Sequence, residues 1–294
     1  MLTVRNLSKS IEQLEVLKSI DFSLNEGQVA GVVGRNGAGK TTLFKTIAGI
    51  MVPDEGTVEF EGLSVHKFPQ SKTNIVFVPD NPEALFGYTP FESAHLFSKV
   101  YPRFDRKYFL DTMKKLDLPM HRKVRQFSKG MRMMFGTALG LSTKAQVVLL
   151  DEPTNGIDPI AKKQVLKLLV EAAEEGTTLV ISSHLLEELE RIADTVLMMK
   201  DGRIDSHSIT ETTDGSIRKF QVVFQEEAPQ SWLSSSNVHV LEHVGRVYTV
   251  LVDIEGKPGP LEELAQLNPM LMEPLPMKLE DLFVWKLGGR SRVG

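Results

Sequence analysis

Hydrophobic and polar residues alternate along the first 30 positions of the chain in the manner of short β-strands. The runs LTVRNL, LKSIDFSL and QVAGVV, at residues 2–7, 17–24 and 28–33, mix β-branched and aliphatic side chains with polar ones. This pattern predicts short β-strands at the start of the chain.

Two later runs predict further strands. VVLL at 147–150 is continuously apolar and precedes two acidic residues, as is typical of a strand buried on both faces of a parallel sheet. TTLVISSH at 177–184 predicts another apolar strand and ends in polar residues. Residues from about 81 to 145 carry helical patterns instead, such as PFESAHLFSKVY at 90–101 and RKYFLDTMKKLDL at 106–118. The combination predicts an α/β fold.

The segment FSKGMRMMF, residues 127–135, predicts a further helix. Ser128 can cap its first turn and Gly130 leaves that turn bare. Apolar residues follow at helical spacing on one face, namely Met131, Met134, Phe135, Ala138 and Leu139. Such an N-terminus is a ready anion site, because its first backbone N–H groups are unpaired. The local sequence alone favours a simpler interpretation, an ordinary capped helix packed through its methionines.

The last third of the chain reads as a small α+β domain. A polar linker is predicted at 206–218, followed by a domain over 219–294. Strands are expected at 220–224, 238–244 and 247–253, the last two joined by a Gly245-Arg246 hairpin turn. Helical patterns follow in PLEELAQL and in MKLEDLFVWKL, the latter with Leu279, Leu282, Phe283 and Leu287 at core spacing. The methionine-rich PMLMEPLPM fits core or interface filling better than a metal site.

Composition excludes several classes of protein. The chain has 294 residues, no cysteine and a net charge of -4, so disulfides and thiolate metal sites are excluded and a nucleic-acid partner is not expected. No apolar run approaches the roughly 18 residues of a membrane span. The start, MLTVRNLSKS, has neither the apolar region of a signal peptide nor a lipidation motif. We therefore expect a cytoplasmic protein whose association with a membrane comes through a partner.

A phosphate-binding loop is predicted between the third strand and the helix that follows it. The spacing Gly34-x-x-x-x-Gly39-Lys40-Thr41 is the P-loop pattern in its required context. Lys40 supplies charge for the β- and γ-phosphates, and the Thr41 hydroxyl suits Mg²⁺. The candidate nucleotide-binding residues are Gly34, Arg35, Asn36, Gly37, Ala38, Gly39, Lys40, Thr41 and Thr42.

The two carboxylates of QVVLLDEPTNGIDP complete a candidate catalytic site. Asp151 and Glu152 follow a buried strand, at the edge where open α/β sheets bind their ligands. In a chain that already has a P-loop, Asp151 is expected to help hold Mg²⁺. Glu152 can polarise the water that attacks the γ-phosphate. His184 lies just past the end of the next predicted strand.

In this order, the motifs resemble those of the ATP-binding subunit of an ABC transporter. The P-loop is GRNGAGKTT, the signature motif corresponds to FSKGM, Walker B is VVLLDEPT, the D-loop is NGID and the switch histidine, His184, lies in ISSH. The resemblance covers about residues 1–205. It implies a P-loop ABC ATPase core with antiparallel β and helical subdomains, the former in the first 30 residues and the latter at about 81–145. It also implies hydrolysis of ATP with Mg²⁺ as cofactor, with Glu152 and His184 as catalytic residues.

The resemblance also implies a second copy of the ATPase. In this family two nucleotide-binding domains pair head to tail, and each signature loop closes over the γ-phosphate held by the other P-loop. Ser128 and the Gly130 amide would then serve the partner's nucleotide, with the helix dipole adding favourable partial charge. The position of FSKGM shortly before VVLLDEPT favours this role over the simple packing role.

Several positions depart from the family's commonest pattern. Asp80 stands where the family has a glutamine, and it is a candidate Mg²⁺ ligand, directly or through water. Ile11 aligns with the usual aromatic that stacks on adenine. Lys129 and Met131 replace a glycine and a glutamine of the signature. These changes resemble the bacterial export subgroup of bacitracin-, lantibiotic- and "acetoin utilisation"-type subunits, as does the closing segment KLEDLFVWKL.

The expected function is therefore to power a separate membrane permease, with export as the direction and a position at the inner face of the cell membrane. The second ATP-binding subunit would be the same or a related chain. Phe86 and Tyr88 are equally explained as the groove that docks the permease and as core residues. A soluble ABC-type ATPase acting on ribosomes or DNA is the main alternative, but such proteins usually carry two cassettes or a long coiled-coil insertion. A silent regulator is disfavoured by the intact Lys40, Asp151, Glu152 and His184.

Overall fold

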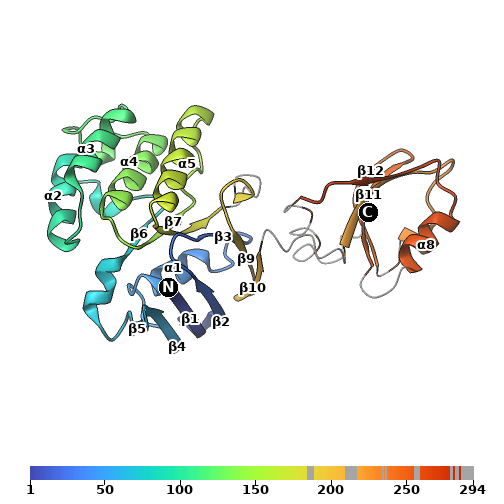
Figure 1. Cartoon of the computed structure of the whole chain (residues 1–294), viewed down its shortest axis with the longest axis horizontal. Helices are drawn as coiled ribbons and strands as arrows, with labels where there is room; N and C mark the ends of the chain where they lie inside the picture. Colours follow the sequence, from blue (N-terminus) through green and yellow to red (C-terminus); the bar gives the residue numbers. More distant parts are fainter. Residues whose placement is uncertain are drawn as a thin grey trace. The chain divides into compact units, whose positions relative to one another are not determined.

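The computed structural model describes residues 1–183, 189–208, 217–233, 235, 237–254, 259–278, 281 and 285. Two compact units divide the chain, Met1–His207 and Ser208–Gly294 (Figure 1). The first unit holds the P-loop and the acidic pair.

An antiparallel sheet opens the first unit. Its strands lie in the order β2-β1-β4-β5, and their bounds are β1 Leu2–Ile11, β2 Leu14–Leu24, β4 Glu55–Phe60 and β5 Leu63–Ser64. Register shifts along β1 mark bulges, which bend the strand and strengthen its twist. The sheet confirms the antiparallel subdomain expected from the sequence.

The second sheet of this unit has six strands in the order β10-β9-β3-β8-β7-β6. Their bounds are β3 Val29–Val33, β6 Ile75–Val78, β7 Val147–Asp151, β8 Thr178–Ser182, β9 Thr195–Lys200 and β10 Arg203–Ser208. The strands from β9 to β6 run parallel. Every residue of β3, β7 and β8 is buried, as continuous apolar runs predict.

One predicted strand lies in a different sheet from the one expected. The expected antiparallel subdomain includes the run QVAGVV at 28–33, but β3 lies in the parallel sheet between β9 and β8. All five residues of β3 are buried, so the strand has no solvent-facing side of the kind that alternation requires.

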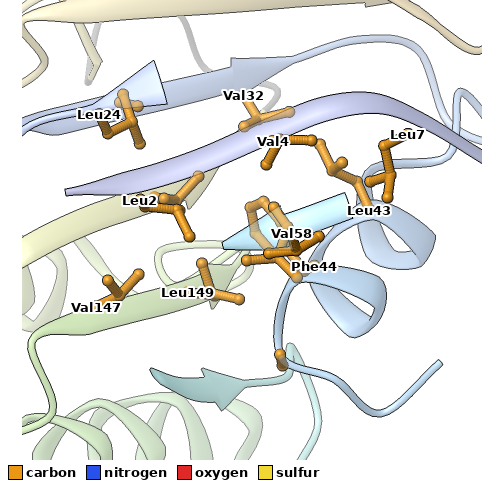
Figure 2. Packing of buried hydrophobic residues seen from close by; sticks show 14 of the residues in the cluster. Leu2, Val4, Leu7, Leu24, Val32, Leu43, Phe44, Val58, Val147 and Leu149 are labelled. Atoms are coloured by element: carbon orange, nitrogen blue, oxygen red, sulfur yellow. The ribbon is translucent and has the colours of Figure 1, made fainter. Parts of the chain in front are cut away.

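Helix α1, Lys40–Ile47, joins the two sheets through a common core. Leu43 and Phe44 of this helix pack with Leu2 and Val58 of the antiparallel sheet and with Leu149 of β7 (Figure 2). Burial of these aliphatic and aromatic side chains fixes the start of α1, and therefore the P-loop before it, against both sheets.

Four longer helices follow the nucleotide loop in the chain and lie close together in Figure 1. They are α2 Pro90–Val100, α3 Arg106–Lys115, α4 Lys129–Ser142 and α5 Pro159–Glu174, with short 3₁₀ turns η1 Pro69–Asn74, η2 Glu83–Leu85 and η3 Val124–Gln126 between the strands and helices. Thr89 and Glu92 form a reciprocal capping box at α2, and Asp158 caps α5. These signals explain where the helices begin.

Helix α4 is not the one-sided amphipathic helix that its spacing predicts. Every residue from Met133 to Ser142 is buried, whereas Met131 is only half-buried. The reason is tertiary, because α4 packs against α3, α5 and strand β6 at once. Gly140 lies against Val78, where a larger residue would not fit. Only the first turn of α4 therefore faces away from the core.

The second unit contains a four-stranded antiparallel sheet in the order β12-β13-β11-β14. Its elements are β11 Ile217–Val223, α7 Gln230–Leu233, β12 Val238–Val244, β13 Val247–Asp253, α8 Gly259–Gln266 and β14 Leu271–Leu275. Val244 pairs with Val247 across a turn in which Gly245 has φ +60°, as a two-residue hairpin requires. Phe220, Phe224 and Trp232 anchor a separate core.

The structure bears on three sequence expectations about this region and changes the first of them. Strand β10 extends to Ser208 and β11 begins at Ile217, so strands occupy both ends of the predicted 206–218 linker. PMLMEPLPM contains the edge strand β14, and its residues are exposed or half-buried, although Met272 packs against the core of this unit. Of the predicted closing helix, Leu279, Leu282, Phe283 and Leu287 lie outside the described residues, while Asp281 forms an ion pair with Lys219 at 2.8 Å.

Candidate active site

The P-loop connects β3 to α1 and is shaped by glycines. Gly37 and Gly39 have φ of +83° and +105°, values that favour glycine. Gly34 is needed for a different reason, since a methyl group there would lie 2.6 Å from the Met199 carbonyl oxygen of β9. The loop is therefore held tightly against the sheet, with its turn open toward the start of α1.

Lys40 is buried inside this loop, with 8% of its surface exposed. Its ammonium donates a hydrogen bond to the Gly34 carbonyl at 2.8 Å and lies 3.9 Å from Glu152 Oε1. A buried ammonium is stable only when paired, and these two contacts provide that pairing. The charge is thus fixed at the centre of the loop, where a phosphate would be held.

Asp151 is bound through both of its carboxylate oxygens. Thr41 Oγ1 donates to Oδ2 and Ser182 Oγ donates to Oδ1, each at 2.6 Å, and Asp151 is only 4% exposed. These hydrogen bonds join the P-loop helix, β7 and β8 into one network. Ser182 is not predicted from the sequence, although its position at the polar end of an apolar strand is a usable signal.

The backbone at Glu152 is strained. Its φ is +50°, in the left-handed region, and its amide donates to Ser182 Oγ at 2.9 Å. A residue other than glycine in this region is held there by its surroundings, at a cost of order 1–3 kcal/mol. Here the strain turns the chain sharply at the end of β7 and brings the Glu152 carboxylate beside Lys40. The position suits a residue that acts on the γ-phosphate.

These groups line a cavity of about 470 Å³. Its walls are residues 36–42 of the P-loop and α1, together with Val16, Asp80, Asp151 and Glu152. Gly34 and Arg35 do not contribute side walls; their carbonyls instead accept hydrogen bonds from Lys40, and the Arg35 carbonyl also accepts one from the Ala38 amide. Asp80 is exposed, on the loop after β6. His184 lies outside the described residues.

The apolar wall of the cavity comes from Val16 of β2. Ile11, at the position of the expected adenine platform, is 42% exposed and does not line the cavity. Val16 is not singled out by the sequence, because an isolated valine in a strand carries no signal of its own. The base would therefore meet a small aliphatic surface instead of an aromatic ring.

The donor set at the mouth of the cavity fits Mg²⁺. Thr41 and Asp151 supply hard oxygen atoms that converge within 2.6 Å. Among the described residues, no group of three or more His, Cys, Asp or Glu side chains could hold a metal by itself. Mg²⁺ is commonly held by one or two carboxylates together with phosphate oxygens, so this incomplete set is what a nucleotide-bound Mg²⁺ needs.

The first turn of α4 is separate from this cavity. Ser128 Oγ accepts a hydrogen bond from the Met131 amide at 3.2 Å, which confirms Ser128 as the N-cap. Gly130 lies beside Ile157 of the D-loop, where an added methyl group would be 3.2 Å from Ile157 Cγ2. Neither Ser128 nor Gly130 is among the described residues that line the cavity. Within one chain, the two predicted anion sites are distinct.

Phe86 and Tyr88 connect to the signature region. The Arg132 guanidinium of α4 lies 4.6 Å from the centre of the Phe86 ring, and Tyr88 is 42% exposed. The backbone carbonyls of Phe86 and Tyr88 accept hydrogen bonds from the amides of Arg125 and Val124. Tyr88 is therefore a surface residue and not a core one, and Phe86 is half-buried beneath Arg132.

Together, the parallel sheet, the P-loop and the acidic pair at the end of β7 define a P-loop nucleotide hydrolase. Comparison with known proteins narrows this class. The profile of the family described as "ABC transporter" matches residues 17–155. The ABC transporter ATP-binding protein YtrB of Bacillus subtilis is 32% identical over 99% of this chain and 100% of its own length.

Two other relatives carry more specific names. The bacitracin transport ATP-binding protein BcrA of Enterococcus faecalis is 26% identical over 98% of this chain and 97% of its own. The lantibiotic transport ATP-binding protein SrtF of Streptococcus pyogenes is 30% identical over 69% of this chain and 89% of its own.

Solved structures agree on the fold. An "ATP binding subunit of ABC transporter" has a TM-score of 0.67 and 24% identity, covering 73% of this chain and 93% of its own. A dimeric bacterial ABC transporter cassette has a TM-score of 0.63 and 22% identity over 71% of this chain and 99% of its own.

The chain belongs to the ATP-binding proteins of ABC transporters, and it is the ATPase subunit of such a transporter. Both the expected family and the expected fold are confirmed. None of the described helices combines the length and the apolar composition that a membrane span requires.

Proposed function

We propose that this subunit binds MgATP, pairs with a second ATP-binding subunit and powers export through a separate membrane permease. The observation that carries the proposal is the network of Lys40, Thr41, Asp151, Ser182 and Glu152 around one cavity. The export direction rests on the resemblance to the bacterial export subgroup, and BcrA and SrtF are named for bacitracin and lantibiotic transport. The permease selects the substrate in this architecture.

Each residue of the network has a distinct task in hydrolysis. Lys40 binds the β- and γ-phosphates and offsets their charge. Thr41 and Asp151 would hold Mg²⁺, which neutralises charge as the γ-phosphoryl group is transferred. Glu152 would accept a hydrogen bond from the attacking water and so orient it. Its carboxylate lies 3.9 Å from the Lys40 ammonium, close to where the γ-phosphate would be held. His184, which lies outside the described residues, is proposed as a further catalytic residue that acts on the γ-phosphate.

The second copy follows from the separation of the two anion sites. Ser128 and Gly130 form a helix N-terminus that does not line their own cavity, so we propose another chain's nucleotide as its ligand. The dimeric cassette of similar fold supports this arrangement.

A mixing experiment tests the head-to-tail arrangement. A Ser128→Arg protomer paired with a Lys40→Ala protomer has one site with both halves intact and one site with neither. We expect the mixture to recover ATPase activity that each variant lacks alone. A mixture that stays inactive, together with an ATP-bound dimer of Ser128→Arg alone, would rule out the arrangement.

The permease would contact the segment around η2. Tyr88 and Phe91 are each 42% exposed and provide aromatic surface beside the backbone that leads to the signature. Binding there would hold the subunit at the inner face of the membrane. The test is purification of the tagged subunit from its native host in mild detergent: a multi-span membrane protein should co-purify, and a Tyr88→Asp variant should lose it.

The soluble alternative, an ATPase that acts on ribosomes or DNA, is not favoured by the comparisons, since the relatives are named as transporter subunits. It makes the opposite prediction in the same experiment. Co-purification of ribosomes or DNA without any membrane protein would overturn the proposed function.

A further inference from the structure

The described residues that line the nucleotide cavity carry more negative than positive charge. Three carboxylates line it, those of Asp80, Asp151 and Glu152, against one ammonium, that of Lys40, among its described lining residues. The ligand that the cavity binds is itself a polyanion. Like charges at short range repel, and the repulsion is larger near a cavity wall than in open water.

Two of these carboxylates have local compensation. Asp151 accepts hydrogen bonds from Thr41 and Ser182, and Glu152 lies 3.9 Å from the Lys40 ammonium. Asp80 differs from both, because no described residue forms a hydrogen bond or an ion pair with its side chain. Its charge faces the cavity from an exposed loop, and no cation among the described residues of its own chain pairs with it.

Lys129, in the signature motif, carries a positive charge that no described residue pairs with. It is the first residue of α4 and is exposed. Its side chain lies over Gly156 of the D-loop, since a methyl group at Gly156 would be 3.1 Å from both Cδ and Nζ of Lys129. The ammonium is therefore held on the surface formed by the signature and the D-loop.

This position is unfavourable for the helix that carries the lysine. A cation in the first turn opposes the helix dipole, and α4 has no acidic residue in its first turn to offset it. The aliphatic part of the side chain packs over Gly156, but an uncharged side chain of similar length could pack in the same way. Packing alone therefore does not explain the charge at this position. Within the described part of the single chain, the ammonium of Lys129 is therefore left to water, and a negative charge on a second chain could still pair with it.

We propose that Lys129 of each protomer completes the partner's nucleotide site, with Asp80 of that site as its electrostatic counterpart. The inference rests on the proposed head-to-tail dimer and adds a trans-acting cation to Ser128 and Gly130. Lys129 offsets the charge that Asp80 adds beside the triphosphate. A carboxylate is thereby tolerated where the resemblance leads one to expect a neutral glutamine.

The test uses the full chain with Glu152→Gln, in which ATP-bound dimers accumulate because hydrolysis is slow. The measured quantity is the ATP concentration that gives half-maximal dimer in sedimentation velocity, with Mg²⁺ present. Lys129→Gln should raise this concentration about tenfold, because each dimer loses two charges that each contribute a few-fold. Lys129→Arg keeps the charge, and Lys107→Gln removes an exposed lysine of α3; both should stay within about twofold of the parent.

Asp80→Asn provides the second arm. This substitution should lower the ATP requirement, and in its presence the effect of Lys129→Gln should shrink to about threefold or less. Added salt should reduce the effect of Lys129→Gln in the chain that retains Asp80, since partly exposed charges are screened.

Each contrary result overturns a different part of the proposal. An equal effect of Lys129→Gln in the presence and in the absence of the Asp80→Asn substitution removes Asp80 as the counterpart. No effect of Lys129→Gln, or an equal loss in Lys129→Arg, shows that the charge of the lysine plays no part in dimer formation. A Glu152→Gln parent that remains monomeric with ATP overturns the head-to-tail dimer itself, which is a different result from all the others.

Discussion

The two candidate anion sites of this ATPase differ in how much of their structure is complete within one chain. In the P-loop cavity, Lys40 and Asp151 are 8% and 4% exposed, and hydrogen bonds tie both to neighbouring elements. At the first turn of α4, Ser128 and Lys129 are exposed, and the Ser128 hydroxyl accepts a hydrogen bond from its own helix.

This difference assigns nucleotide binding to the single chain and the pairing of two chains to the signature. A preorganised, buried site can hold nucleotide alone, because its polar groups are already oriented and desolvated. An exposed helix N-terminus has weak affinity for an anion by itself, since water competes for the same N–H groups. It becomes effective when a second surface excludes that water. Changes in the cavity should therefore affect single chains, and changes at the signature should affect pairs.

The largest expected effect comes from Glu152. Replacing it with glutamine should leave MgATP binding nearly unchanged and lower the hydrolysis rate by about 10² or more, the usual scale for a positioned base. Steady-state ATPase assays and equilibrium binding measure the two quantities. Near-normal turnover of the variant would remove Glu152 from this role, and the P-loop cavity could then not be described as the catalytic site on this ground.

A smaller effect is expected for Lys40→Ala. Loss of a charge-assisted contact to the phosphates contributes about 1.5–3 kcal/mol, so ATP affinity should fall about 10- to 100-fold. The matched control is Lys45→Ala in the last turn of α1, which should bind ATP like the parent. Titration of the monomeric protein is the appropriate measurement, and equal affinities of the two variants would contradict the preorganised site.

The smallest effect concerns the base of the nucleotide. Ile11 is exposed outside the cavity and Val16 is its apolar wall, so the roughly 1 kcal/mol of an aromatic stack on adenine is absent. GTP should bind within about tenfold of ATP. A hundredfold preference for ATP would show that another residue recognises the base.

Residues whose geometry is set by a short segment of the chain can be predicted from the sequence, and residues brought in by distant segments cannot. The P-loop, Asp151 and Glu152 are recognisable because their geometry is local: a strand, a tight turn and a helix carry the whole signal. Ser182 and Val16 escape prediction because they reach the cavity only through sheet pairing and have no motif around them. Hydrogen bonding across strands is not encoded in any short window.

The two wrong predictions about the fold have a related cause. The run Val29–Val33 is expected in the wrong sheet, and the pattern of α4 predicts an amphipathic helix, because both predictions assume one solvent-exposed side. Each element is instead enclosed by neighbours that are distant in sequence. Local periodicity reports exposure, and it fails where tertiary packing covers every face.

The most direct test of the central claim is the ATP-dependent association of Ser128→Arg in the Glu152→Gln background, followed by sedimentation velocity. Arginine at this position removes the capping oxygen and adds bulk at the exposed turn, while the buried P-loop cavity is left untouched. We predict that the variant binds ATP with nearly parental affinity and remains monomeric at ATP concentrations that dimerise Glu152→Gln. An ATP-bound dimer as abundant as that of the parent would contradict the claim that the signature helix serves the partner's nucleotide.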